Sequence, residues 1–276
     1  MRNTERYLTI FLAVVFVIAV SIWGPEALAK YKDKGILNKP HVEEVEEAGE
    51  GYRYRMNANE KLYILSRSLG SQILPESEQN ALSYAGSTDL GYEDLEGSYA
   101  FVRNYKEPTG REITDEQIYA TCNEGVDMLK ELGILPPEVR EVAAASYDAT
   151  LYSAIDILEP RNNVAVWKIE LSNSQKNADK GNRLIDAYID ADDGKIYEFY
   201  ARTSLLWSDI DTDAIVEAWS KYMGLDSPSV YESDNPLLET TPYFKKYVFS
   251  GMGEGRTIVT VGYYEGINEI FLKISQ

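Results

Sequence analysis

The chain has 276 residues, of which 44% are hydrophobic, enough for one large or two modest domains with packed cores. Its formal net charge of -18 excludes nucleic acid as an expected partner, because phosphates would be repelled. The single cysteine, Cys122, excludes an intrachain disulfide, and the single histidine, His41, excludes a metal site built from several histidines. We therefore expect no metal and no other cofactor.

An uncharged apolar run, Tyr7–Trp23, lies close to the N-terminus. At ~1.5 Å per residue, a helix over this run reaches the short end of what spans a hydrocarbon core of ~30 Å. The run is longer than the roughly 7–15-residue apolar segment of a cleaved signal peptide. It therefore predicts that residues 1–29 form a membrane anchor, with residues 7–23 in the bilayer and the soluble part extracytoplasmic. The alternative is a secreted protein, cleaved near Ala29.

Two further regions precede the more regular part of the chain. Residues 30–51 are charged and contain an acidic run, which predicts a juxtamembrane stalk. Residues 52–112 predict an irregular α+β region, with a strand at Ser98–Tyr105 and a short helix at Pro75–Ala85. A further helix in this region is indicated by Leu62, Ile64, Leu65 and Leu69, with Asn57 or Asn59 as its cap and Gly70 at its end.

Residues 113–204 predict an α+β unit that opens with a helix. Thr114 and Gln117 have the spacing of a capping box. One apolar stripe follows at helical spacing, made of Ile118, Cys122, Val126, Leu129 and Leu132. Because a nucleophilic thiol would need a histidine partner, Cys122 is interpreted as a core residue. Later strands are predicted at Glu141–Asp148, Thr150–Leu158 and Val164–Leu171, and a polar loop at Ser172–Gly181.

The clearest pattern in the soluble part is Arg183–Thr203, which predicts two strands joined by a tight acidic turn. The turn, Asp190–Lys195, does not have the pattern of a calcium-binding loop. Such a loop needs a ligand at its fifth position and glycine at its sixth, whereas this sequence places Gly194 and Lys195 there. The aspartates are therefore interpreted as turn-forming residues.

Residues 205–276 predict a second, diverged α+β unit. Its helix begins at Asp211 and ends at Gly224, and Asp209 and Asp213 are interpreted as part of the same helix start, not as calcium ligands. Gly251–Gly255 lacks the Lys-Ser/Thr ending of a phosphate-binding loop and is interpreted as a hairpin turn. Strands are predicted at Ser229–Glu232, Tyr243–Phe249, Thr257–Tyr264 and Ile267–Ile274. The expected fold class is α+β, with an N-terminal transmembrane helix followed by tandem helix-plus-antiparallel-sheet units.

The segment Thr114–Thr203 resembles a PepSY-like domain, a helix followed by an antiparallel sheet whose last hairpin carries a family pattern. The matching residues are Ile189, Asp190, Ala191, Gly194, Lys195 and Ile196, and the chain departs from the pattern at Asp193, where the family often has threonine. By the same resemblance, Asp211–Ile274 is a diverged second copy. The resemblance implies an extracytoplasmic bacterial protein that inhibits peptidases or regulates cell-surface proteins, without catalysis of its own.

The expected function is therefore a non-enzymatic regulatory module, tethered to the membrane, that binds another envelope protein or peptide. The architecture is also similar to that of bacterial regulators of sporulation or cell-wall signalling. Exposed edge strands would be a natural contact. The alternatives are a carboxylate-dependent cell-wall polymer hydrolase and a structural envelope component. Several aromatic residues belong either to the core or to a peptide- or glycan-binding surface: Trp167, Trp207, Trp219 and many of the 21 tyrosines.

Overall fold

The computed structural model describes residues 55–71, 99–105, 108, 112–178, 181–232 and 239–276, which all fall within the unit Ala48–Gln276. Four predicted features lie outside these residues: the membrane anchor, the stalk, the helix at Pro75–Ala85 and His41. No helix within the described ranges is long and apolar enough to cross a bilayer.

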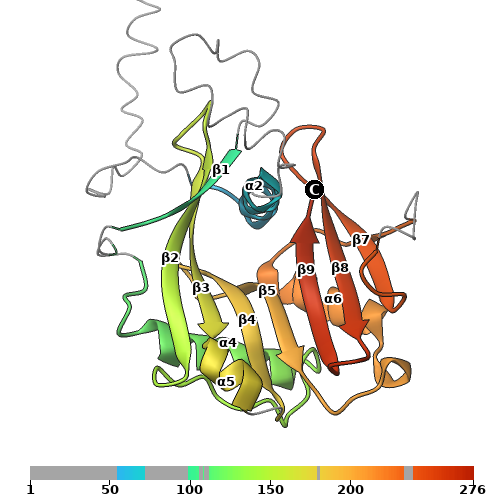
Figure 1. Ribbon diagram of the computed structural model, residues 1–276. Helices are drawn as coiled ribbons and strands as arrows, with labels where there is room; N and C mark the ends of the chain where they lie inside the picture. The colour runs from blue at the N-terminus through green and yellow to red at the C-terminus, as the bar shows by residue number, and fades with distance from the viewer. Residues whose placement is uncertain (1–54, 72–98, 106–107, 109–111, 179–180, 233–238) are drawn as a thin grey trace, which may run out of the picture. The chain divides into compact units, whose positions relative to one another are not determined.

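One antiparallel sheet of nine strands organises the described residues (Figure 1). In space the strands follow the order β1-β2-β3-β4-β5-β9-β8-β7-β6. Their bounds are β1 Tyr99–Arg103, β2 Tyr147–Asp156, β3 Asn163–Leu171, β4 Arg183–Asp190, β5 Ile196–Arg202, β6 Ser229–Tyr231, β7 Phe244–Ser250, β8 Arg256–Tyr264 and β9 Glu269–Ser275. The predicted α+β class is confirmed, with a large antiparallel sheet and a few helices.

The order of a helix followed by four strands occurs twice along the chain. Helix α4, Ile118–Glu131, precedes strands β2 to β5, and helix α6, Thr212–Met223, precedes strands β6 to β9. The last strands of the two series, β5 and β9, pair with each other at the centre of the sheet, where Phe199 lies opposite Leu272. The two series therefore share one continuous sheet.

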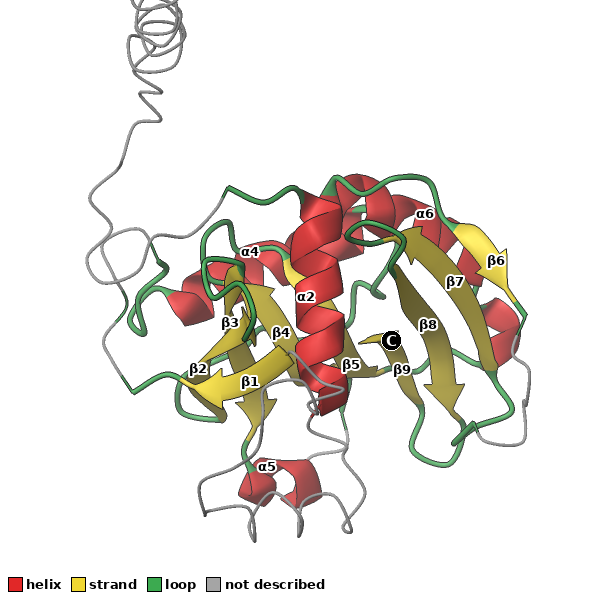
Figure 2. Cartoon of the chain, turned by 90° about the horizontal axis from the view of Figure 1, so that it is seen from above, coloured by secondary structure: helices red, strands yellow, loops and turns green. Residues whose placement is uncertain are grey.

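Helices α4 and α6 cover the same face of the sheet, which we call the outer face (Figure 2). Alternate strand residues point to this face and form the apolar core with the helices. Trp167 donates from Nε1 to the Ile113 carbonyl at 2.8 Å, and Trp219 donates to the Ile196 carbonyl at 3.0 Å. Both indoles are buried with their one polar group satisfied, so they serve the core and not a binding surface.

The ends of the two helices differ from each other. Asp211 caps α6 through Oδ1, which accepts from the Ala214 N–H at 3.0 Å, and Gly224 ends the helix with a left-handed φ of 76°. Both features agree with the prediction. At α4 only half of the predicted capping box forms: the Thr114 N–H donates to the Gln117 side chain, but the Thr114 carbonyl accepts from the Gln117 N–H.

Helix α2, Ala58–Ser71, lies on the other face of the sheet, which we call the inner face. In both views it runs between the strands β1 to β3 on one side and β8 and β9 on the other (Figures 1 and 2). Asn57 and Glu60 form a complete capping box at its start. Its buried residues surround the axis because the curved sheet contacts the helix from two sides. They are Leu62, Tyr63, Ile64, Leu65, Ser66 and Ser68.

The structure corrects two predicted elements. The predicted strand at Glu141–Asp148 is wrong: strand β2 begins only at Tyr147, and a turn at Ala144–Ser146 precedes it. The predicted loop at Ser172–Gly181 contains a short helix, α5 Asn173–Ala178. In each case a short polar or alanine-rich stretch is compatible with several local structures, and its neighbours in the fold decide between them.

Candidate functional site

The acidic turn between β4 and β5 has the hydrogen bonds of a tight reversal. The Asp190 carbonyl accepts from the Gly194 N–H at 3.0 Å, and Asp190 Oδ1 accepts from the Asp192 N–H at 2.7 Å. Asp193 Oδ1 accepts from the Lys195 N–H at 3.1 Å. Gly194 has a φ of 74°, a left-handed conformation that glycine adopts without steric cost. The predicted hairpin is therefore present, and its aspartates hold the turn together.

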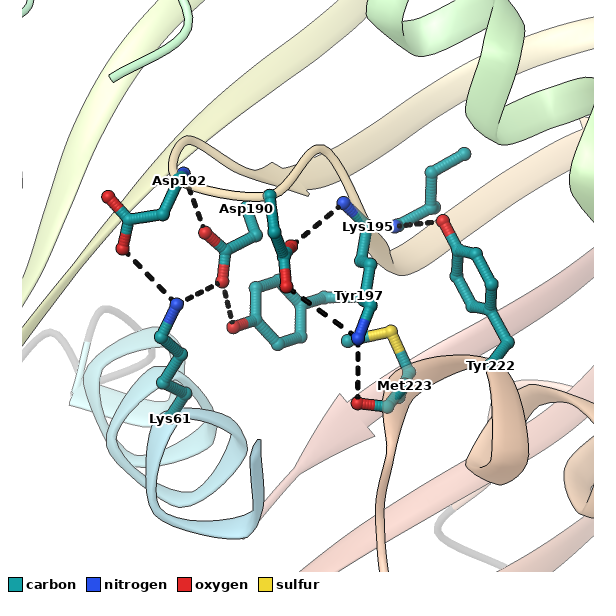
Figure 3. A network of polar contacts seen from close by, with 9 residues as sticks. Lys61, Asp190, Asp192, Lys195, Tyr197, Tyr222 and Met223 are labelled. Carbon is teal, nitrogen blue, oxygen red and sulfur yellow. Dashed lines mark hydrogen bonds and ion pairs between the residues drawn. The ribbon is translucent and has the colours of Figure 1, made fainter. Parts of the chain in front are cut away.

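The Asp190 side chain also connects the turn to helix α2 on the inner face (Figure 3). Asp190 Oδ2 accepts from Lys61 Nζ at 2.8 Å and from the Tyr197 hydroxyl at 2.6 Å. Lys61 also donates to Asp192 at 3.2 Å. Asp190 is 1% exposed, so solvent does not reach its carboxylate. The Lys61 and Tyr197 donors compensate the buried charge instead.

Opposing effects act on the proton affinities in this network. Burial lowers the pKa of Lys61, but the charges and hydrogen bonds of Asp190 and Asp192 outweigh it, so the pKa stands above its ordinary value. Burial, followed by the charge of Asp190, raises the pKa of Tyr197 well above that of a free tyrosine. Both donors therefore keep their protons at neutral pH, as a stable joint between elements requires.

On its other sides the turn contacts both outer-face helices. Lys195 Nζ donates to the Met223 carbonyl at the end of α6 at 3.3 Å, and the Tyr222 hydroxyl accepts from the Ile196 N–H at 3.0 Å. A Cβ placed on Gly194 would lie 2.5 Å from the Thr121 side chain of α4. The predicted family-marker residues Asp190, Gly194 and Lys195 thus join three helices, and Ala191 is fully buried beside them.

A second group of polar residues lies on the same inner face, nearer the other end of β4 and β5. We call it the inner-face cluster, and it comprises Lys168, Glu170, Asp186, Tyr188, Glu198, Tyr200, Tyr264 and Phe271. The register places these side chains together: Asp186 lies opposite Glu170 on β3 and opposite Tyr200 on β5, and Tyr188 lies opposite Lys168 and Glu198. Most of them are partly exposed, unlike Asp190.

Aromatic rings form a row across the cluster. The Phe271 ring stacks on Tyr200 at 5.5 Å and on Tyr264 at 4.8 Å between ring centroids. It lies against Gly262, where an added Cβ would come within 2.3 Å of the ring. A second group lies beside it, with Phe101 stacked on Tyr152 at 4.6 Å and edge-on to Tyr188 at 5.7 Å. The two phenylalanine rings are buried and the tyrosine rings are partly exposed, so the tyrosines on this rigid sheet offer contact area at small cost in side-chain entropy.

The charged residues of the cluster are unequally paired. Glu170 accepts from Lys168 at 3.0 Å and from Lys176 of α5 at 2.6 Å, which lowers its pKa, the Lys176 hydrogen bond being the largest cause. Asp186 lies 3.9 Å from Lys168 Nζ, beyond hydrogen-bonding distance, and its Oδ1 is buried with no hydrogen-bond partner among the described residues. Burial raises the pKa of Asp186 to about 6.

Glu198 lies deeper in the same face and is 5% exposed. Its Oε2 accepts from the Ile274 N–H at 2.9 Å. Burial raises its pKa to about 7, because this hydrogen bond offsets only part of the cost of burying a charge. The cluster can therefore accept hydrogen bonds, stack against planar groups and hold a positive charge.

The other residues considered as candidate site residues from the sequence do not come together in one site. Cys122 is fully buried, and burial raises the pKa of its thiol to about 12, which makes it a core residue and a poor nucleophile. Asp211 caps α6 while Asp213 binds Lys245 at 2.6 Å, so both are occupied. Within the described ranges, no group of three or more His, Cys, Asp or Glu side chains is arranged to hold a metal ion.

Sequence reasoning missed Lys61, Asp186 and Glu198. A signal for Asp186 was available, because in RLIDAYID it occupies the alternate position to the buried Ala187 and Ile189, so it had to lie on the inner face. Lys61 could not be assigned, because its partner is distant in sequence. No protein-family model, no curated protein and no solved structure matches the chain.

Proposed function

We propose that the chain is a non-enzymatic extracytoplasmic module, tethered to the membrane through residues 7–23, that binds another envelope protein or peptide. The observation that carries this proposal is the inner-face cluster, in which partly exposed rings of Tyr188, Tyr200 and Tyr264 lie beside charged groups on a nine-stranded sheet. Aromatic side chains held rigidly by a sheet are typical of surfaces that bind polypeptides.

The edge strands are less suited to binding a partner than the inner face is. Strand β1 packs against helix α2 through Tyr63 and Tyr99, whose ring centroids are 6.1 Å apart. Strand β6 is only three residues long, Ser229–Tyr231, although its Val230 is exposed. Because strand addition needs a long, accessible edge, we place the contact on the inner face instead.

The proposed fold family supports a binding role. The helix followed by four antiparallel strands suits a PepSY-like unit at residues 113–204, and the same order of elements in residues 205–276 suits a diverged second copy. Regulation of sporulation or of cell-wall signalling is the process that we propose for such a module. The family-marker turn, Asp190–Lys195, has a packing role because Asp190 is buried. We therefore assign binding to the inner-face cluster and not to this turn.

Site-specific photo-crosslinking tests the binding role. The photoreactive residue p-benzoylphenylalanine replaces Tyr264 on the inner face or, as the matched control, the exposed Met128 on α4 of the outer face. In intact cells that make the protein, illumination is expected to yield a covalent adduct with an envelope protein from position 264 and none from position 128. Absence of an adduct at 264, or equal adducts at both positions, would contradict the proposal.

The location is tested separately. If residues 7–23 anchor the chain, protease added to cells with a permeable outer surface digests the soluble part, and the anchor stays with the membrane. Full protection of the soluble part would refute an extracytoplasmic location. If the chain is instead secreted, the N-terminal sequence of the mature protein begins just after Ala29.

A carboxylate-dependent cell-wall polymer hydrolase is the second candidate, because two acids with raised pKa values, Asp186 and Glu198, share the inner face. It is the weaker candidate, since Glu198 is buried and accepts a backbone hydrogen bond from Ile274. The test is release of soluble fragments from purified cell wall. Activity that disappears in Glu198→Gln would establish the hydrolase and overturn the non-enzymatic proposal.

A further inference from the structure

Asp186 differs from the other carboxylates of the inner-face cluster in what surrounds it. Glu170 has two lysine donors within 3.0 Å, and Glu198 has a backbone donor at 2.9 Å. Asp186 has its nearest cation, Lys168, at 3.9 Å, and that lysine already bonds to Glu170. Its Oδ1 is buried without a hydrogen-bond partner among the described residues, so a donor from outside reaches the carboxylate at Oδ2, where it would reduce the cost of holding the charge partly out of water.

The carboxylate is accessible to such a donor. The Asp186 side chain keeps 26% of its surface exposed, whereas Asp190 on the same strand keeps 2%. The two residues point to the same face, but Lys61 of helix α2 occupies the position over Asp190. The described residues place no equivalent lysine over Asp186, which therefore offers the same chemistry to a group from outside.

Two tyrosines lie next to Asp186. Tyr200 is its cross-strand partner on β5, and Tyr188 follows it by two residues on the same face of β4. The charge of Asp186 also acts on Tyr188. The pKa of Tyr188 is raised first by burial and then by the charges of Glu198 and Asp186. A planar cation that pairs with a carboxylate and stacks on tyrosine rings is the arginine guanidinium.

We propose that Asp186 anchors an arginine side chain of the bound peptide, with Tyr188 and Tyr200 packing against the guanidinium. This inference rests on the proposed function and names the residue type that the site selects. Arginine is favoured over lysine because its guanidinium can donate to Asp186 Oδ2 while its planar face stacks on an aromatic ring, which an ammonium group cannot do in the same way. The net charge of -18 favours a basic partner over an acidic one.

Paired peptides test the inference with the full-length chain in detergent micelles. The probes are fluorescein-labelled Gly-Tyr-Arg-Tyr-Gly and the same peptide with citrulline, which keeps the shape of arginine and lacks its charge. Fluorescence anisotropy is measured at pH 7.5, above the pKa of about 6 for Asp186. We expect the arginine peptide to bind about ten-fold more tightly than the citrulline peptide.

Two variants, each lacking one carboxylate, show which residue causes the preference for the arginine peptide. Asp186→Asn is expected to remove most of it, because the anchoring charge is lost. Asp127→Asn removes an equally negative residue from α4 on the outer face, where Asp127 is 58% exposed, and is expected to keep the preference. If both variants reduce binding equally, the preference reflects net charge alone and the inference is wrong.

The remaining outcomes separate the inference from the proposed function. Equal affinity for the two peptides, reduced by Tyr200→Ala, would show that the face binds peptides without an arginine anchor, which overturns the inference and leaves the proposed function standing. Binding of neither peptide also overturns the inference. In that case the adduct at position 264 decides independently whether the inner face binds a protein.

Discussion

The hairpin turns at the two ends of the sheet have opposite surroundings. At one end, which we call the closed end, the turn Asp190–Lys195 contacts helices α2, α4 and α6, and its central aspartate is buried. At the other, the open end, the turn between β8 and β9 contains Gly266, which has nothing within 4 Å of an added Cβ, and Ile267, which is 54% exposed. Each turn closes the last hairpin of its series.

This difference shows that a turn sequence records local geometry, whereas its importance depends on what packs around it. The closed end concentrates contacts between elements that are distant in the chain, so substitutions there should affect folding. The inner-face cluster extends from Glu198 toward the open end and keeps partly exposed tyrosine rings and an incompletely paired acid, so substitutions there should affect binding first.

The largest expected effect is at Lys61. Lys61→Met leaves the buried Asp190 with Tyr197 as its one side-chain donor among the described residues, and we expect a loss of about 4 kcal/mol in unfolding free energy. Urea denaturation measures it. The control is Lys221→Met, which breaks the exposed pair with Glu217 and should cost under ~0.5 kcal/mol. Equal costs would mean that the closed end has no special role in stability.

The next effect is a pH dependence at Glu198, between the two ends. Its folded pKa of about 7 lies above the ordinary glutamate value of 4.5, so the unfolded chain releases the proton first as pH rises. Stability from this group is complete below pH 4.5 and is lost by about pH 7, a change on the order of 3 kcal/mol. Denaturation of wild type and Glu198→Gln across this window should diverge by that amount. Parallel curves would contradict the raised pKa.

Substituting one glycine in each turn by alanine compares the two turns directly. Gly194→Ala combines a left-handed φ with a clash against Thr121 and should cost about 2 kcal/mol. Gly266→Ala meets neither obstacle and should cost under ~0.5 kcal/mol. Thermal denaturation of the two variants, side by side, measures the difference. A Gly194 variant as stable as the Gly266 variant would show that α4 does not restrict the closed turn.

The smallest effect on stability is expected at Tyr264 in the open half. Tyr264→Ala removes the stacking on Phe271 and should cost about 1 kcal/mol. The same variant should weaken binding of the tyrosine-containing peptide by several-fold, whereas Lys61→Met should leave the affinity of the folded protein unchanged. Anisotropy titrations at a temperature where both variants are folded measure this, and the reverse pattern would refute the division of roles.

Whether each of these features can be predicted from the sequence depends on how far apart in the chain its interacting residues lie. The hairpin at Arg183–Thr203 and the caps at Asp211 and Gly224 were predictable, because each depends on residues within a few positions. Pairing of β5 with β9 was not, since alternating patterns in two strands do not say which strands are neighbours.

The candidate site depended on the same long-range information. The aspartates at Asp190 and Asp186 have similar local sequence, each on the inner face of β4. They acquire different roles only because Lys61, far away in the chain, lies over one and not the other. Sequence alone could interpret the turn as structural, but it could not distinguish a compensated acid from an available one.

The pairing of β5 with β9 also determines when the fold can be completed during synthesis. Strand β5, Ile196–Arg202, is central in the finished sheet, but its partner, β9 Glu269–Ser275, is made only after strands β6, β7 and β8. Until then the edge of β5 is unpaired and open to association with other chains. Strand β9 is therefore the element that converts an aggregation-prone intermediate into a closed sheet, and removing it should affect protein yield before it affects any binding.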